Sequence, residues 1–103
     1  MFDKKMLEKY RKELPKVGIP YRDNMRLKFY DILSVVEFEE HYDKVKVIKS
    51  LSKASLNLEK QLFSKYRMPR DYATKCRSLI FNLSNVKNPL LRYRILFGDL
   101  TSE

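Results

Sequence analysis

Side chains that could carry chemistry gather in one short acidic stretch of this 103-residue chain. The stretch holds the only histidine, His41, beside the carboxylates of Glu37, Glu39, Glu40 and Asp43. Carboxylates next to an imidazole can bind a metal or transfer protons, but a loop for a hard cation usually needs a glycine at its sharp turn, and none occurs here. We therefore interpret the stretch as a solvated connection with acidic residues near the start of a helix.

The rest of the sequence offers no second catalytic combination. The only histidine lies in the acidic stretch, so no Ser-His-Asp or Cys-His arrangement can be formed elsewhere. The single cysteine, Cys76, excludes an internal disulfide and is expected to pack as a small apolar side chain. We predict that the chain is not an enzyme and has no catalytic, cofactor-binding or metal-binding residues.

The most specific pattern in the chain is a basic stretch from Tyr72 to Gly98. Its residue order predicts two short helices joined by an exposed basic turn. In the second helix, Asn88 can cap the first turn, Pro89 suits the first helical position, and Gly98 can end the helix in a left-handed conformation.

Three motifs carry a family resemblance. Upstream, Arg22 and Arg26 lie one helical turn apart, and a Leu58-Glu59 pair precedes further apolar residues. The downstream block reads Arg77-Ser78-x-x-x-Asn82-Leu83, then Lys87-Asn88-Pro89-x-Leu91-Arg92, then Gly98-Asp99-Leu100-Thr101. Together these motifs resemble the central domain of the transcription elongation factor TFIIS, over about residues 22–101.

The resemblance implies a helical domain that docks on the large subunit of RNA polymerase II in the nucleus. In that family, a linker and a zinc ribbon follow the central domain, and the ribbon stimulates transcript cleavage by arrested polymerase. One cysteine cannot supply the four ligands of such a ribbon. We interpret the chain as a fragment or reduced homologue that lacks the ribbon, so zinc is expected only in a missing segment. Alone, it is expected to bind polymerase without stimulating cleavage.

Composition sets independent limits on size and partner. A hydrophobic content of 44% in 103 residues is enough for one small folded domain, and no apolar run approaches the length of a membrane span. The net charge of +9 favours an acidic partner. Residues 64–103 carry eight basic and three acidic side chains, so the basic motif lies within the positive excess.

Apolar spacing predicts an all-α fold, a small three-helix bundle with short additional helices at the N- and C-terminal ends. Residues 1–20 are expected to form a helical arm, capped by Asp3, and a linker. Residues 21–103 are expected to form the central domain, truncated at its C-terminal end.

Within the bundle, Asp23 is expected to cap the first helix, with Arg26 and Lys28 facing solvent. The second helix is expected to run from about residue 43 to residue 66, and the third to begin at Met68-Pro69. Apolar residues of the last helix would close the core: Leu90, Leu91, Ile95 and Leu96.

Five basic residues are assigned to polymerase binding: Lys75, Arg77, Lys87, Arg92 and Arg94. The alternative is that they only keep a basic protein soluble. A second function remains open, because tyrosines among basic residues can stack on bases: a basic helical domain that binds DNA or RNA. A third is a TFIIS-like central domain within a chromatin-associated transcription regulator. We expect a monomer with no membrane contact and at most weak or indirect contact with nucleic acid.

Overall fold

The computed structural model describes residues 2–36, 38, 41–85, 87 and 89–101, with side chains described as far as Phe97. The described residues form five helices and no strand. The helices are α1 (Lys4–Lys12), α2 (Pro20–Leu33), α3 (Lys44–Lys65), α4 (Pro69–Ser84) and α5 (Pro89–Thr101). This arrangement confirms the predicted all-α fold.

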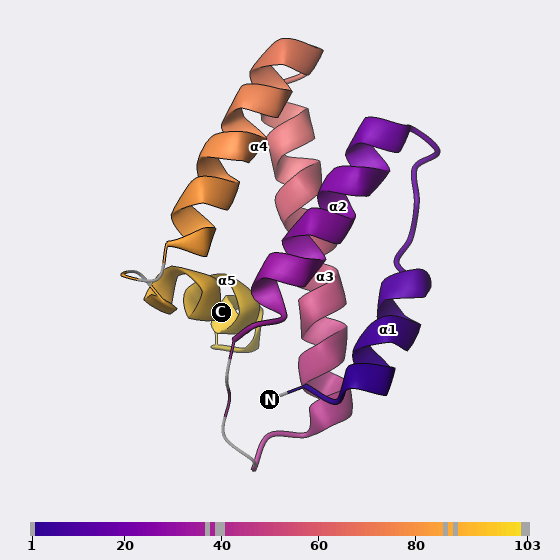
Figure 1. The fold of residues 1–103 in the computed structure, drawn as a ribbon, viewed down its shortest axis with the longest axis vertical. Helices are drawn as coiled ribbons and strands as arrows, with labels where there is room; N and C mark the ends of the chain where they lie inside the picture. Colours follow the sequence, from indigo (N-terminus) through magenta and orange to yellow (C-terminus); the bar gives the residue numbers. More distant parts are fainter. Residues whose placement is uncertain (1, 37, 39–40, 86, 88, 102–103) are drawn as a thin grey trace.

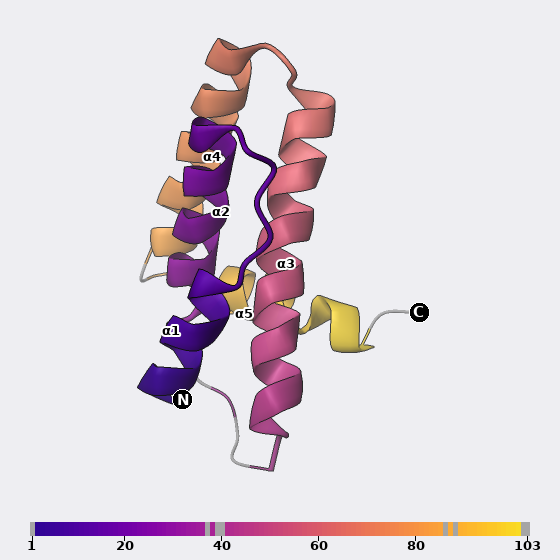
Figure 2. The same ribbon diagram turned by 90° about the vertical axis from the view of Figure 1, so that its right-hand side faces the viewer.

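Helices α2, α3 and α4 form the main bundle, and two shorter helices close its lower end (Figure 1). α3 and α4 form an antiparallel hairpin with a short connection at the top (Figure 2). α5 lies across the lower ends of α2 and α4 and contacts α3, and α1 packs beside the lower part of α3 (Figures 1 and 2). α2 and α3 make the most extensive contact between any two helices.

Local sequence signals account for most of the helix starts. The carboxylates of Asp3 and Asp43 accept hydrogen bonds from backbone N–H groups in the first turns of α1 and α3. Prolines take the first positions of the other three helices, where the missing N–H costs no hydrogen bond.

The predicted cap at Asp23 is wrong, because α2 already begins at Pro20. The Asp23 carboxylate instead reaches back to the linker and accepts hydrogen bonds from the backbone N–H groups of Val17, at 2.8 Å, and Gly18, at 3.1 Å. Gly18 has a φ of 85°, a left-handed conformation that favours glycine and turns the chain into α2. The linker is therefore held by the helix that follows it.

The predicted helix end at Gly98 is also wrong, since α5 continues through Gly98 to Thr101. Glycine can adopt helical as well as left-handed dihedral angles, so its presence alone does not end a helix. The predicted cap at Asn88 lies outside the described residues.

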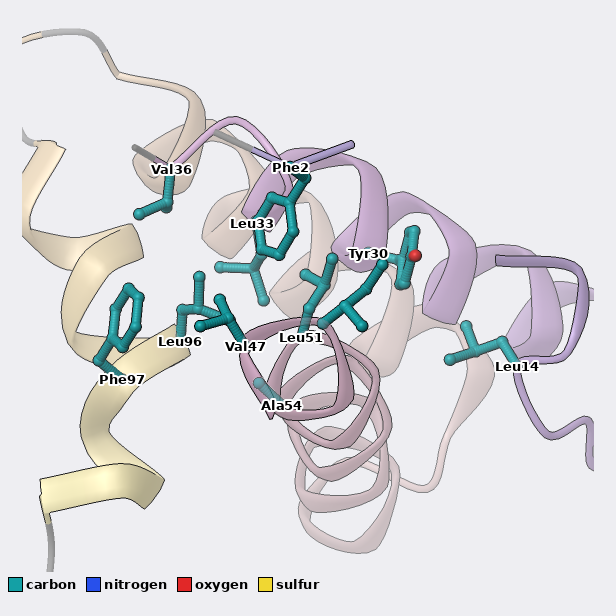
Figure 3. Packing of buried hydrophobic residues seen from close by; sticks show 11 residues of the cluster. Phe2, Leu14, Tyr30, Leu33, Val36, Val47, Leu51, Ala54, Leu96 and Phe97 are labelled. Atoms are coloured by element: carbon teal, nitrogen blue, oxygen red, sulfur yellow. The ribbon is translucent and has the colours of Figure 1, made fainter. Parts of the chain in front are cut away.

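The apolar core has two parts that meet at α2 and α3. The larger part joins α1, α2, α3 and α5, and Figure 3 shows Leu33, Val47, Leu51 and Leu96 pointing toward one another at its centre. The second part lies between α2, α3 and α4 and consists of the buried residues Phe29, Tyr72, Cys76 and Leu83.

One residue assigned to the core from sequence lies on the surface. Leu90 is 60% exposed, whereas Leu96 and Phe97 are almost fully buried. Six helical steps separate Leu90 from Leu96, which places them about 120° apart around the helix axis. The burial of Phe97 was not predicted.

None of the described helices combines the length and the apolar character needed to cross a bilayer.

Candidate partner-binding surface

A buried carboxylate joins the three main helices. Glu59 of α3 is fully buried and accepts hydrogen bonds from Arg22 and Arg26 of α2 and from Tyr72 of α4. Arg22 donates through Nε at 2.7 Å and Nη2 at 3.0 Å, Arg26 through Nε at 2.8 Å, and the Tyr72 hydroxyl at 2.8 Å. We call these four residues the Glu59 network.

The protonation states within the network follow from its hydrogen bonds. Burial alone would raise the pKa of Glu59, but the bonds from Arg22, Arg26 and Tyr72 outweigh it and lower the pKa below its ordinary value. Burial and the bond to Glu59 both raise the pKa of Tyr72. Glu59 is therefore ionised and Tyr72 protonated at neutral pH. Both carboxylate oxygens are already occupied by donors, which indicates a structural role.

The network also fixes parts of the chain outside the helices. Arg26 donates through Nη1 to the carbonyl of Pro15 in the linker at 3.1 Å, and the Arg22 guanidinium lies 3.7 Å from the centre of the Phe63 ring. The prediction that Arg26 faces solvent is wrong, since it is 2% exposed. A charged residue is rarely buried unless it is paired, and Glu59 is the partner that the helical pattern of α2 could not reveal.

Two of the predicted binding residues flank the buried face of α4. Lys75 and Arg77 are both exposed and lie on either side of Cys76, which is fully buried. Their spacing of two residues separates them by about 200° around the helix. Lys75 lies on the α3 side, with its Nζ 5.3 Å from the centre of the Tyr66 ring. Helical geometry therefore directs the two cations to opposite borders of α4.

The other three predicted residues belong to the α4–α5 connection and α5. Lys87 and Arg94 are exposed, whereas Arg92 is half-buried. The Nη1 group of Arg92 donates a hydrogen bond to the carbonyl of Leu83 in the last turn of α4. Arg92 thus holds α5 against α4 as well as offering a cation at the surface.

A further surface feature was not predicted from sequence. Large apolar or aromatic side chains are exposed near the meeting point of α2, α4 and α5: Val35 at 63%, Phe81 at 74%, Leu90 at 60% and Tyr93 at 39%. Phe81 lies outside the buried positions of α4, which are Tyr72, Cys76 and Leu83.

The described residues of the acidic stretch, and Cys76, make contacts within the fold. Asp43 caps α3, the His41 ring stacks on Tyr42 with centres 4.6 Å apart, and Glu37, Glu39 and Glu40 lie outside the described residues. Among the described residues, no group of three His, Cys, Asp or Glu side chains could hold a metal ion. Burial raises the pKa of the Cys76 thiol to about 11.

Comparison with known protein families gives a match over most of the chain. The sequence model of the transcription factor S-II (TFIIS) central domain matches residues 18–103, which include the Glu59 network and all five predicted binding residues. Searches of curated proteins and of solved structures gave no match. Helix α1 precedes the matched range.

Proposed function

We propose that this chain, which belongs to the family of TFIIS central domains, binds RNA polymerase II as the anchoring domain of a transcription elongation factor. The matched range contains the whole of α2 to α5. In this family the central domain positions the factor, and the polymerase performs the chemistry. We accordingly propose a nuclear, non-catalytic binding domain that acts as a monomer.

The observation that carries the proposal is a set of exposed cations without acidic partners. Among the described residues, the salt bridges involve Arg11, Arg22 and Arg26. None of them involves Lys75, Arg77, Lys87 or Arg94. These four side chains are free to meet an acidic protein surface. Such contacts mainly set orientation and association rate, while a few buried anchors supply most of the affinity.

Retention of purified RNA polymerase II on the immobilised chain tests the proposal. We expect the unmodified chain to retain polymerase in excess duplex DNA, and a Lys75→Glu, Arg77→Glu, Lys87→Glu variant to lose it. The matched control replaces three exposed lysines at the start of α3 by glutamate: Lys44, Lys46 and Lys49. It has the same net charge as the test variant. Equal loss in the two variants would show that only overall charge matters and would contradict a defined docking surface.

Transcript cleavage separates binding from catalysis. We expect this chain to bind backtracked polymerase complexes without accelerating transcript cleavage, because it lacks the ligands of a zinc ribbon. A full-length TFIIS in the same reaction provides the positive control. Robust cleavage stimulated by this chain alone would overturn the non-catalytic assignment.

A nucleic-acid-binding function is the second candidate, supported by one specific arrangement. The Nζ atoms of Lys65 and Lys75 both lie near the ring of Tyr66, 5.7 Å and 5.3 Å from its centre. An aromatic ring close to cations can stack on a base while the cations meet the phosphate. If excess duplex DNA displaces polymerase from the chain, this candidate replaces the first. A central domain within a chromatin-associated regulator would instead bind polymerase in each of these experiments.

A further inference from the structure

Two adjoining surface pockets lie where α2, α4 and α5 meet. One, of about 360 Å³, is lined by Val35, Val36, Pro89, Leu90, Arg92 and Tyr93. The other, of about 370 Å³, is lined by Asp31, Ile32, Val35, Ser84 and Arg92. They share Val35 and Arg92 and therefore lie next to each other, and we call the two together the junction pocket.

The apolar lining of the junction pocket lies open to solvent. Val35 and Leu90 are 63% and 60% exposed, and Tyr93 contributes an aromatic ring that is 39% exposed. Grouped apolar side chains of this kind usually mark an interaction site, whereas isolated ones need no explanation. Each of the two pockets lies at the lower end of the volume range of ligand sites, about 300–1,000 Å³, and suits an inserted side chain better than a large cofactor.

The surface beside the pocket continues along α4. Arg77, Phe81 and Ser84 follow one another at spacings of four and three residues, so they lie on one face of the helix. Ser84 lines the junction pocket, and Phe81 is 74% exposed. An exposed aromatic ring and a cation thus extend the same face away from the pocket.

The charge around the pocket is positive among the described residues. Asp31, the one carboxylate among the described lining residues, accepts two hydrogen bonds of 2.8 and 2.9 Å from Arg11 of α1. Arg92 lines both pockets, and its Nε is buried without a hydrogen-bond partner within the described part of the chain. Lys87, two residues before the lining residue Pro89, and Arg94, next to the lining residue Tyr93, are both exposed.

We propose that the junction pocket binds an acidic peptide segment of a partner protein, with a leucine or phenylalanine of that segment inserted between Val35, Leu90 and Tyr93. The inserted side chain buries apolar surface, and flanking carboxylates meet Arg92 and the neighbouring cations. The inference goes beyond polymerase docking, because a peptide of this chemistry defines a partner site whatever protein supplies it.

Titration of the isotope-labelled chain with short synthetic peptides tests this proposal. The probe is an acidic peptide of Asp and Glu residues around one leucine. One comparison peptide replaces the leucine by serine, and another replaces the acids by their amides. We expect saturable shifts of the backbone amide signals of Val35, Leu90 and Tyr93 with the probe. We expect an affinity at least about tenfold lower for either comparison peptide.

Two variants locate the site on the chain. The Val35→Ser, Leu90→Ser double variant is expected to lose at least about tenfold in probe affinity. Met68→Ser is the matched control, because Met68 is 67% exposed in the α3–α4 connection, and it is expected to leave the affinity unchanged. Since all three side chains are largely exposed, each variant should keep its circular dichroism spectrum and melting temperature.

Several outcomes would overturn the proposal. Equal binding of the three peptides would indicate general attraction to a basic surface, and shifts confined to other helices would place the site elsewhere. A dimer in sedimentation whose interface involves the same amides, and which the probe does not dissociate, would identify a second copy as the occupant. Polymerase retention by the Val35→Ser, Leu90→Ser variant would leave polymerase docking standing even if probe binding failed.

Discussion

At the scale of single residues, the charge of Glu59 is the most consequential in the molecule. Two arginines and a tyrosine from two other helices point at one fully buried carboxylate. Replacing Glu59 by glutamine keeps the shape but leaves two guanidinium groups without a counter-charge. We expect Glu59→Gln to lower the free energy of unfolding by about 3–5 kcal/mol. Urea denaturation measures this, and Glu8→Gln, at an exposed position on α1, is the matched control that should change little.

The same carboxylate predicts how stability depends on pH. Because the pKa of Glu59 is lower in the folded chain than in the unfolded chain, its contribution is complete above the unfolded value of about 4.3. The contribution is lost as the pH falls through the folded value. The difference in melting temperature between the unmodified chain and Glu59→Gln should therefore be constant from neutral pH to about pH 5 and shrink below it. A difference that grows on acidification would contradict the assigned direction.

At the scale of elements, α1 is a part of the fold that precedes the matched family range. Three kinds of contact hold it. Arg11 pairs with Asp31 at a half-exposed position, whereas Leu14 just after the helix is 5% exposed within the larger core. The Tyr30 hydroxyl also donates to the carbonyl of Leu7 at 2.8 Å. Apolar burial should thus dominate the attachment.

We expect Leu14→Ala to lower the free energy of unfolding by about 2–5 kcal/mol. Arg11→Ala should cost at most about 1 kcal/mol, because exposed ion pairs contribute little. Chemical denaturation of the two variants gives the comparison, and limited proteolysis reports whether α1 is released first. If Arg11→Ala proved the more damaging change, the ion pair and not the core would anchor this helix.

Elements also show how far sequence reasoning reached. The starts of α1 and α3 were predictable because Asp3 and Asp43 cap their own neighbouring residues, a purely local signal. Burial of Arg26 depends on Glu59, 33 residues away, and no helical pattern contains that information. Leu90 was misplaced because a short apolar run does not reveal which of its residues faces inward. The separation of Lys75 and Arg77 around α4 was predictable from their spacing in a helix.

At the scale of the whole molecule, the net charge of +9 should govern how fast the chain meets an acidic partner. Long-range attraction depends on total charge and is screened by salt, whereas residence time depends on contacts made after docking. Both triple variants, at Lys75, Arg77 and Lys87 and at Lys44, Lys46 and Lys49, should therefore associate with polymerase several-fold more slowly than the unmodified chain at low salt. Only the variant at Lys75, Arg77 and Lys87 should also dissociate faster.

Surface plasmon resonance over a range of salt concentrations separates the association rate from the dissociation rate. If the association rate proved independent of salt, the charge of the chain would have no part in recognition. If both variants dissociated faster by the same factor, the basic residues of α3 would have to belong to the interface as well.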